Sequence, residues 1–364
     1  MLYPLLFTPT PIQRIWGGGY IAKYIHPQFP AHQKIGESWS LCGLEECSSV
    51  VCNGFLKDND INELIEVYMG DLLGDPVYQK FGCEFPLIVK ILDINDYLSF
   101  QVHPSDEIAL ARHNAYGKAE AWYILDAEPD ATIFLGFNRP MNESEFRTRC
   151  LNQTLPEVMN QFTPHAGDCF YIPTGTVHAA GGGLVVAEIQ QVSDITYRIF
   201  DWGREFHKES AREMHLDLAM EVINWEPFEK SQVMQAMQKS QESQESLLET
   251  PYFHLFRRGI TTSVSFSNTF GSSFRLLICT EGEIEISATG IGISADEIEI
   301  SANGTEISTN EIEISANETI RIKKGGVTLI PAAISQYTVV PKSESRKDGN
   351  KPLPAAEMLE IFIP

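Results

Sequence analysis

The sequence predicts a mainly β protein: a sandwich or barrel of short strands with inserted helices, followed by a second β-rich domain. Two observations predict this class. Short apolar runs separated by Gly and Pro begin near residue 85, and strand-like alternation resumes after a Gln/Ser/Glu-rich stretch at 230–250. With 364 residues, 43% of them apolar, the chain has enough material for two cores. We expect a catalytic domain at 1–229, a linker at 230–250 and a C-terminal β domain at 251–364.

The N-terminal 55 residues are rich in Gly, Pro and aromatic residues. The segments Trp16-Gly-Gly-Gly and Gly36-Glu-Ser-Trp indicate tight turns and short strands. Residues 60–73 place apolar side chains at helical spacing, and Pro76 follows. We therefore expect a helix that ends near this proline.

Strand-like runs then dominate, and helices are expected between them. The expected strands are Phe85–Leu92, Tyr97–His103, Ala121–Leu125, Thr132–Leu135, Cys169–Ile172, Leu184–Gln190 and Thr196–Phe200. The expected helices are Ser105–His113, Glu143–Leu151 and about Ser210–Asn224. Pro104 followed by Ser-Asp-Glu favours a helix start, because acidic side chains stabilise a first turn.

An internal repeat lies in the C-terminal block at 283–317. In five units of seven residues, beginning with EIEISAT and ending with EIEISAN, Ile alternates with Glu or Ser, and turn residues stand at the unit ends. This spacing predicts strands and not a coiled coil. The repeat is either a hairpin extension or small solenoid stack, or a duplication inside a hairpin loop without a specific role, and we favour the duplication.

The formal net charge of −22 argues against nucleic acid and anionic membranes as partners. The sequence has no apolar run of the roughly 18–20 residues that a membrane helix needs, and its first residues do not resemble a signal peptide. Seven cysteines without a C-x-x-C pair indicate reduced thiols in a cytoplasmic protein. An anionic substrate would need a local cluster of basic residues.

The strongest candidate site combines Gln101, His103, Glu120 and His178. The first two lie two residues apart on one expected strand, so their side chains share a face. Each of the others lies at the end of another expected strand, and strand ends of one barrel can meet at its mouth. Two His and one carboxylate can hold zinc and leave a position open, with the Gln amide as a further ligand.

Four segments of the sequence carry a resemblance to a known family. FPLIVKILDINDYLSFQVHPSDEIA, GKAEAWYIL, PTGTVHA and EIQQVSDITYRIFDWGR resemble the class I mannose-6-phosphate isomerases, most closely their short bacterial branch. The similarity runs from Trp16 to about Trp225. It implies a cupin (jelly-roll) barrel with inserted helices, and a second, degenerate cupin-like β domain without metal. It also implies one Zn²⁺ per chain, held by Gln101, His103, Glu120 and His178.

The implied activity is the interconversion of mannose 6-phosphate and fructose 6-phosphate through a cis-enediol. The family's catalytic arginine falls on Arg198, its lysine before the metal-binding Glu on Lys118, and a strand lysine on Lys90. Basic side chains here would offset the acidic chain and bind the sugar phosphate. We assign Arg198, Lys118 and Glu188 to catalysis, and Lys90 and Arg204 to substrate binding. The proton-transfer base stays open between Lys118, Glu188 and zinc-bound water.

Two other functions compete with this interpretation. One is an iron-dependent cupin dioxygenase, which would need an apolar substrate cavity. The other is a non-catalytic cupin that binds sugar phosphates. Arg198 could instead form an ion pair with Asp194 or Asp201, and Trp16 and Trp39 could line the pocket, although we expect core packing for both. We expect a monomer or weak dimer.

Overall fold

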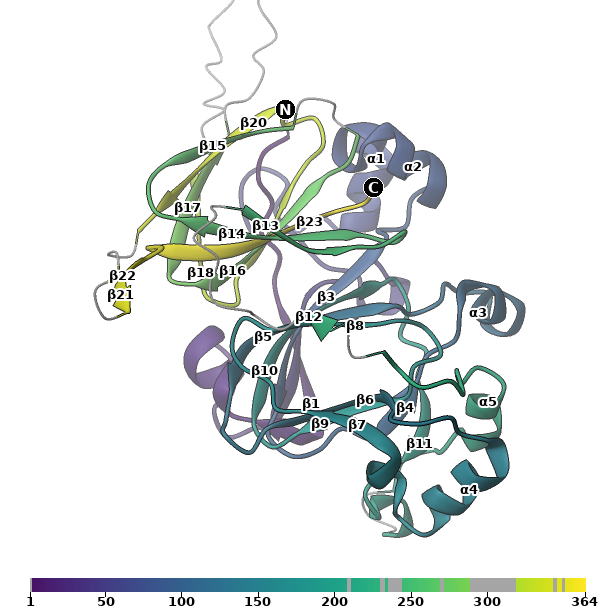
Figure 1. Ribbon diagram of the computed structural model, residues 1–364. Coiled ribbons are helices and arrows are strands. Elements are labelled where there is room, and N and C mark those ends of the chain that lie inside the picture. Colours follow the sequence, from purple (N-terminus) through teal and green to yellow (C-terminus); the bar gives the residue numbers. More distant parts are fainter. Residues whose placement is uncertain are drawn as a thin grey trace, which may run out of the picture.

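The computed structural model contains two β-rich units, one built from the N-terminal strands and one from the C-terminal strands (Figure 1). It describes residues 2–207, 211–229, 244–268, 272–288, 319–342 and 354–364, and the backbone alone at 233–234, 346–348 and 351–353. The mainly β prediction is confirmed. Within the described residues no helix is long and apolar enough to cross a membrane.

The N-terminal unit consists of two facing sheets. The larger has the strand order β1-β2-β3-β10-β5-β8-β12 and the smaller β11-β4-β9-β6-β7. Their bounds are β1 Thr10–Gly18, β2 Ile35–Leu41, β3 Leu87–Ile94, β4 Phe100–Val102, β5 Glu120–Ala127, β6 Thr132–Phe137, β7 Met159–Phe162, β8 Cys169–Ile172, β9 His178–Gly181, β10 Leu184–Gln191, β11 Tyr197–Phe200 and β12 Val233–Met234. Apolar side chains from both sheets, among them Leu92, Trp122 and Ile133, form one core between them.

The first two helices lie beside the C-terminal unit and the other three lie beside the N-terminal sheets (Figure 1). The helices are α1 Ile61–Leu73, α2 Asp75–Phe81, α3 Asp106–His113, α4 Glu143–Leu151 and α5 Leu216–Met220, with short turns at η1 Ile21–Ile25, η2 Glu45–Cys47, η3 Leu155–Val158 and η4 Arg204–Phe206. The α3 and α4 predictions are confirmed. The helix expected at 60–73 is confirmed as α1, which ends just before Pro76, and Pro76 itself lies in the first turn of α2, where its missing N–H costs nothing. One expectation was wrong, because the helix expected at 210–224 is only one short turn of helix, α5.

The C-terminal unit also packs two sheets face to face, in the orders β13-β14-β23-β16-β19 and β15-β20-β17-β18. The strands are β13 Gln244–Glu249, β14 His254–Ile260, β15 Val264–Ser267, β16 Arg275–Glu281, β17 Glu283–Ala288, β18 Thr319–Lys323, β19 Val327–Ile330, β20 Gln336–Pro341 and β23 Ala356–Phe362, with a separate hairpin of β21 Arg346–Asp348 and β22 Lys351–Leu353. Their inward Ile, Leu, Met and Tyr side chains form one apolar core.

The two units share a large apolar interface. The outer face of the seven-stranded sheet, including Val89 and Ile91, packs with Leu276 and Ile361 of the C-terminal sheet in one buried cluster. The N-terminal segment contributes as well, because Leu5 exchanges backbone hydrogen bonds with Leu329 of β19 (2.8 and 3.0 Å). Every residue of β3 and β10 is buried because both faces of this sheet are covered.

Strands also occur where the sequence suggested a linker. β12 pairs with β8, and β13 joins the C-terminal sheet. The domain division at 230–250 therefore stays a prediction. The first repeat unit forms β17, a strand as expected, and the repeat from residue 289 to residue 317 lies outside the described residues.

Candidate active site

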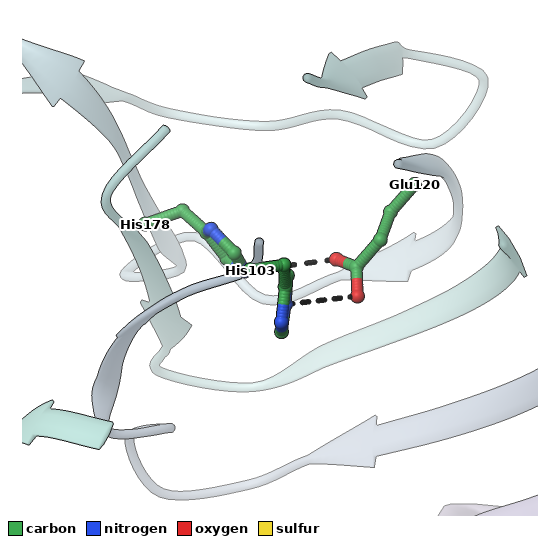
Figure 2. Close-up of side chains that lie close together, drawn as sticks. All are labelled: His103, Glu120 and His178. Carbon is green, nitrogen blue, oxygen red and sulfur yellow. Dashed lines mark ion pairs between the residues drawn. The ribbon is translucent and has the colours of Figure 1, made fainter. Parts of the chain in front are cut away.

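Three predicted ligands meet at one end of the N-terminal barrel. His103 follows β4, Glu120 begins β5 and His178 begins β9. His103 Nε2 lies 3.1 Å from Glu120 Oε1, and His178 Nε2 lies 3.6 Å from Glu120 Oε2. Figure 2 shows the carboxylate facing both histidines. All three side chains are buried, and one potential ligand atom from each lies within 4.8 Å of the others.

The histidine rings are held so that the correct nitrogen faces the cluster. His103 Nδ1 contacts the Ile195 carbonyl (2.8 Å), and His178 Nδ1 contacts the Thr176 carbonyl (2.9 Å). A carbonyl only accepts, so each Nδ1 carries the proton and each Nε2 keeps its lone pair. Such outer contacts are typical of metal-binding histidines.

The cluster passes a direct test of fit for a metal ion. His103 Nε2 and both oxygens of Glu120 are buried without a hydrogen-bond partner. Buried polar atoms are normally satisfied, so these lone pairs require a partner. Lys118 Nζ lies 2.7 Å from Glu120 Oε1 but does not meet hydrogen-bond geometry. Two imidazole nitrogens and a carboxylate are suitable ligands for a divalent transition metal.

The electrostatics of the cluster favour the protonation states that a metal needs. Burial lowers the pKa of His103 and, to about 4, that of His178, so both imidazoles are neutral at pH 7. Burial acts to raise the pKa of Glu120, but the charge of the adjacent Lys118 outweighs burial and holds that pKa well below its usual value. Neutral imidazoles and an ionised carboxylate bind metal without losing protons.

Gln101 joins the cluster from the neighbouring strand. It pairs in register with His178, and its Nε2 lies 3.2 Å from His178 Nε2. A half-turn of the amide would place Oε1 there instead, since the two orientations have nearly the same shape. The structure therefore brings all four predicted ligands together.

A cavity of about 440 Å³ opens beside Gln101 and Lys118. It is lined by Gln13, Arg14, Ile15, Trp16, Glu37, Lys90, Leu92, Leu98, Ser99, Gln101, Lys118, Glu188, Asp194, Thr196, Arg198 and Arg212. Five of these side chains are cationic and three are carboxylates. The lining is therefore net positive, although the chain as a whole carries a charge of −22.

Glu188 and Lys90 face each other across paired strands β10 and β3. Lys90 Nζ lies 3.8 Å from Glu188 Oε2, 3.3 Å from Asp194 Oδ1 and 4.1 Å from the centre of the Trp39 ring. Trp122 Nε1–H donates to Glu188 Oε1 (2.9 Å). Burial, together with the charge of Glu120, raises the pKa of Glu188 to about 7.

The two predicted arginines have different surroundings. Arg198 lines the cavity, where it donates to Ser99 Oγ (3.3 Å) and to the Glu213 carbonyl (2.8 Å). It forms no ion pair with Asp194 or Asp201, the alternative partners in the sequence, and burial lowers its pKa.

Arg204 lies outside the cavity lining. Its guanidinium contacts Asp201 (2.7 Å) and Asp96 (3.2 Å) and donates to the Tyr97 carbonyl (2.6 Å). The structure thus does not bring Arg204 together with the other predicted residues. With two aspartates and one backbone carbonyl as partners, Arg204 stabilises the loop after β11.

Several cavity residues were not predicted from the sequence. Arg14 Nε donates to Glu37 Oε1 (2.7 Å), and Trp39 Nε1–H donates to Glu37 Oε2 (2.7 Å). Arg212 binds Asp201 and also lines the cavity. In the sequence, the only indication of a cavity residue here was the charged Glu37 within Gly36-Glu-Ser-Trp. The glycine and the tryptophan of this segment indicated only a turn or short strand.

Comparison with known proteins identifies the family. Residues 5–142 match the model of the phosphomannose isomerase type I catalytic domain. Mannose-6-phosphate isomerase ManA of Bacillus subtilis is 36% identical over 284 residues, which cover 77% of this chain and 86% of ManA. The chain belongs to the type I phosphomannose isomerase family. A mannose-6-phosphate isomerase of Streptococcus mutans is 30% identical over 287 residues, or 79% of this chain and 88% of that protein.

Solved structures of phosphomannose isomerases share the fold along the whole chain. The enzyme from Bacillus subtilis matches with a TM-score of 0.74 and 23% identity, covering 99% of both chains. The apo form of the Salmonella typhimurium enzyme matches with a TM-score of 0.70 and 15% identity, covering 100% of both chains. These neighbours confirm the predicted cupin fold.

Proposed function

We propose that this phosphomannose isomerase family member interconverts mannose 6-phosphate and fructose 6-phosphate in the cytoplasm, with one zinc ion per chain. The observation that carries the proposal is the cluster of Gln101, His103, Glu120 and His178 beside a net-positive cavity. The relatives named mannose-6-phosphate isomerases support the same substrate pair. The cavity volume of about 440 Å³ is adequate for one hexose phosphate.

Zinc suits the mixed nitrogen and oxygen ligands of this cluster. When bound, it supplies a Lewis acid that polarises the sugar carbonyl and so favours loss of the neighbouring proton. Only Gln101 among the four ligands lines the cavity, so the substrate would approach the cluster from that side. We assign proton transfer and the binding of negative charge to side chains of the cavity.

Glu188 is our candidate for the group that moves the proton between C1 and C2. A base in this position converts either sugar to a cis-enediol by removing a proton, and it returns the proton to the other carbon. The carboxylate lies in the cavity lining, and Trp122 fixes its orientation. A pKa of about 7 is well matched to a group that must both accept and donate at neutral pH.

Three cations of the cavity would support this chemistry. Lys118 lies against Glu120, and burial acts to lower its pKa, but the nearby carboxylates outweigh burial and raise it, so Lys118 stays charged. Its charge therefore stabilises negative charge that develops on the sugar oxygens. Arg198 has its guanidinium in the cavity without a carboxylate partner at ion-pair distance in the described part of the chain, which suits an anionic substrate. Lys90 positions Glu188.

The proposal is tested by metal analysis and activity measurements on one preparation of the purified chain. We expect about one zinc per chain, conversion of mannose 6-phosphate to fructose 6-phosphate, loss of activity on chelation and recovery on adding zinc. Conversion that is unchanged after complete metal removal would contradict the metal role. No conversion by the zinc-loaded protein would contradict the isomerase assignment.

The same preparation separates the competing functions. Iron with oxygen consumption would indicate a dioxygenase, and sugar phosphate binding without turnover would indicate a binding protein. Arg198→Lys keeps the charge but loses the planar fork, so we expect KM for the sugar phosphate to rise about tenfold or more. Arg139→Lys, at a surface ion pair with Glu145, is the matched control.

A further inference from the structure

Two cysteines lie in contact behind the wall of the cavity. Cys42 Sγ and Cys47 Sγ are 3.0 Å apart, about 1 Å longer than the roughly 2.05 Å of a disulfide bond. Cys42 is buried and Cys47 is half-buried. The other cysteines have no such neighbour among the described residues, and Cys52 and Cys83 are exposed single thiols. The C-x₄-C spacing alone offers no reason to pair them.

Backbone hydrogen bonds hold the two thiols in this position. The Ser49 amide donates to the Cys42 carbonyl and the Cys42 amide donates to Ser49 Oγ, both at 2.9 Å, which closes the loop 42–49 at its base. Inside the loop, the Cys47 amide donates to the Leu44 carbonyl (3.0 Å). The Leu44 amide donates to Cys42 Sγ (3.4 Å). The closed loop holds both sulfurs in place before any bond forms.

We propose that Cys42 and Cys47 are a redox-active pair that closes to a disulfide by exchange with a small-molecule disulfide such as oxidised glutathione. Cys47, the more accessible thiol, loses its proton and attacks the reagent, forming a mixed disulfide and releasing one small thiol. Cys42 then loses its proton and attacks Cys47 Sγ, which forms the internal bond and releases the second small thiol. The two protein thiols are oxidised and the reagent is reduced to two thiols.

The environment of the pair makes this reaction slow but its product stable. Burial raises the pKa of both thiols, so little thiolate is present at neutral pH. Because burial disfavours the thiolate, the reduced pair gains no stability from ionisation. A pair of thiols whose reduced form is not stabilised in this way favours the disulfide at equilibrium. The pair is therefore suited to persistent oxidation and not to rapid turnover.

The loop is connected to the cavity through one small apolar cluster. Cys42 packs with Trp39, Ile88 and Val192, and Cys47 contacts the edge of this cluster. Trp39 in turn carries the Lys90 ammonium over its ring. A disulfide would fix the loop against the side of the strand that supports this lysine.

The test is to incubate the folded full-length chain with excess oxidised glutathione at pH 8.5, stop exchange with acid and map the thiols by mass spectrometry. Cleavage after Glu46 separates Cys42 from Cys47, so a disulfide links two peptides that are otherwise free. We expect this link in most of the protein, a loss of two hydrogen atoms, and slower amide exchange at 42–49. Dithiothreitol should reverse all three.

Two variants and one internal control make the result decisive. Cys52→Ser should keep the link, which excludes a bond from Cys42 to Cys52, whereas Cys47→Ser should lose it. Cys83 should instead retain glutathione as a mixed disulfide, since no second thiol lies beside it. Free Cys42 and Cys47 in wild-type protein whose Cys83 has reacted would overturn the proposal, as would stable glutathione on Cys47. Both outcomes are read in the wild-type chain and do not depend on how the variants fold.

Discussion

One buried carboxylate of each unit, Glu360 in the C-terminal unit and Glu120 in the N-terminal unit, is held in a different way. In the C-terminal unit, Glu360 is held by Arg258 (2.7 Å), by Arg275 (3.4 Å) and by the Tyr337 hydroxyl (3.3 Å). In the N-terminal unit, Glu120 has Lys118 at ion-pair distance (2.7 Å) from one oxygen, but neither of its oxygens accepts a hydrogen bond of normal geometry. Among the described residues, every buried side-chain nitrogen or oxygen without a hydrogen-bond partner belongs to the N-terminal unit. A buried carboxylate whose oxygens accept hydrogen bonds supports the structure. A buried carboxylate whose oxygens accept none indicates that a ligand belongs beside it.

The largest expected effect comes from removing one ligand of the unsatisfied cluster. His103→Ala should lower kcat/KM about a thousandfold, because it removes one of the two imidazoles that we propose as metal ligands and with it the electrostatic stabilisation at the cluster. The measurement is kinetics together with zinc content. His113→Ala is the matched control, since that ring contacts the Tyr197 hydroxyl (2.7 Å) outside the cluster. Full activity with a normal zinc content in His103→Ala would contradict the site.

A pair of buried glutamates sharpens the comparison directly. Glu188→Gln should lower kcat about a hundredfold because it removes the proposed proton carrier, without lowering the unfolding free energy. Glu360→Gln should do the reverse. Loss of a paired buried charge costs about 3–5 kcal/mol of stability, but kcat of the folded fraction should be retained. Kinetics and urea unfolding of both variants measure the two effects, and equal losses of kcat would remove the distinction.

The pH dependence of stability should carry a signature of Glu188. Its folded pKa is about 7, above the usual 4.5, so between these values the folded state holds more protons than the unfolded state. This contribution is fully present below pH 4.5 and is lost as the pH rises through 7. In metal-free protein we therefore expect Glu188→Gln to raise Tm relative to wild type by more at about pH 7.5 than at about pH 5. A constant difference would show that Glu188 titrates normally.

The smallest expected effect concerns the contact between the units. Tyr123 donates its hydroxyl proton to Glu357 Oε1 (2.7 Å) across the interface. Tyr123→Phe should cost about 1.5–3 kcal/mol of unfolding free energy, the usual net value of a hydrogen bond to a charged group, because the apolar packing of the ring stays. Urea unfolding measures the change. A loss above about 3 kcal/mol would mean that polar contacts, and not the apolar core, hold the units together.

Local patterns in the sequence were sufficient for most of the fold. The apolar runs predicted β3, β8 and β10, and the helix signals at Ser105 and Glu143 predicted α3 and α4, because these elements depend on nearby residues. The helix expected at 210–224 was predicted too long. The apolar residues Ala219, Met220 and Ile223 pack into the cluster around Phe100 and Phe137, but only Leu216–Met220 is helical.

The four residues that we propose as metal ligands could be predicted to lie together, because each lies at a strand end and matches a family motif. Glu37, Arg14 and Arg212 could not be predicted, because they reach the cavity from segments far apart in the chain. Arg204 shows the opposite failure, since it is close to Arg198 in sequence but turns to Asp96 and Asp201.

The sequence by itself determined the mainly β class, the residues of the candidate metal cluster and the family resemblance, because motif spacing and strand periodicity are written in local order. Only the tertiary structure decided which charges share the cavity, which carboxylate is left unsatisfied and which two thiols touch. These features depend on the register and packing of strands that are distant in sequence. The interaction energy of two charged groups depends on their distance and burial, and neither can be calculated from the order of residues along the chain.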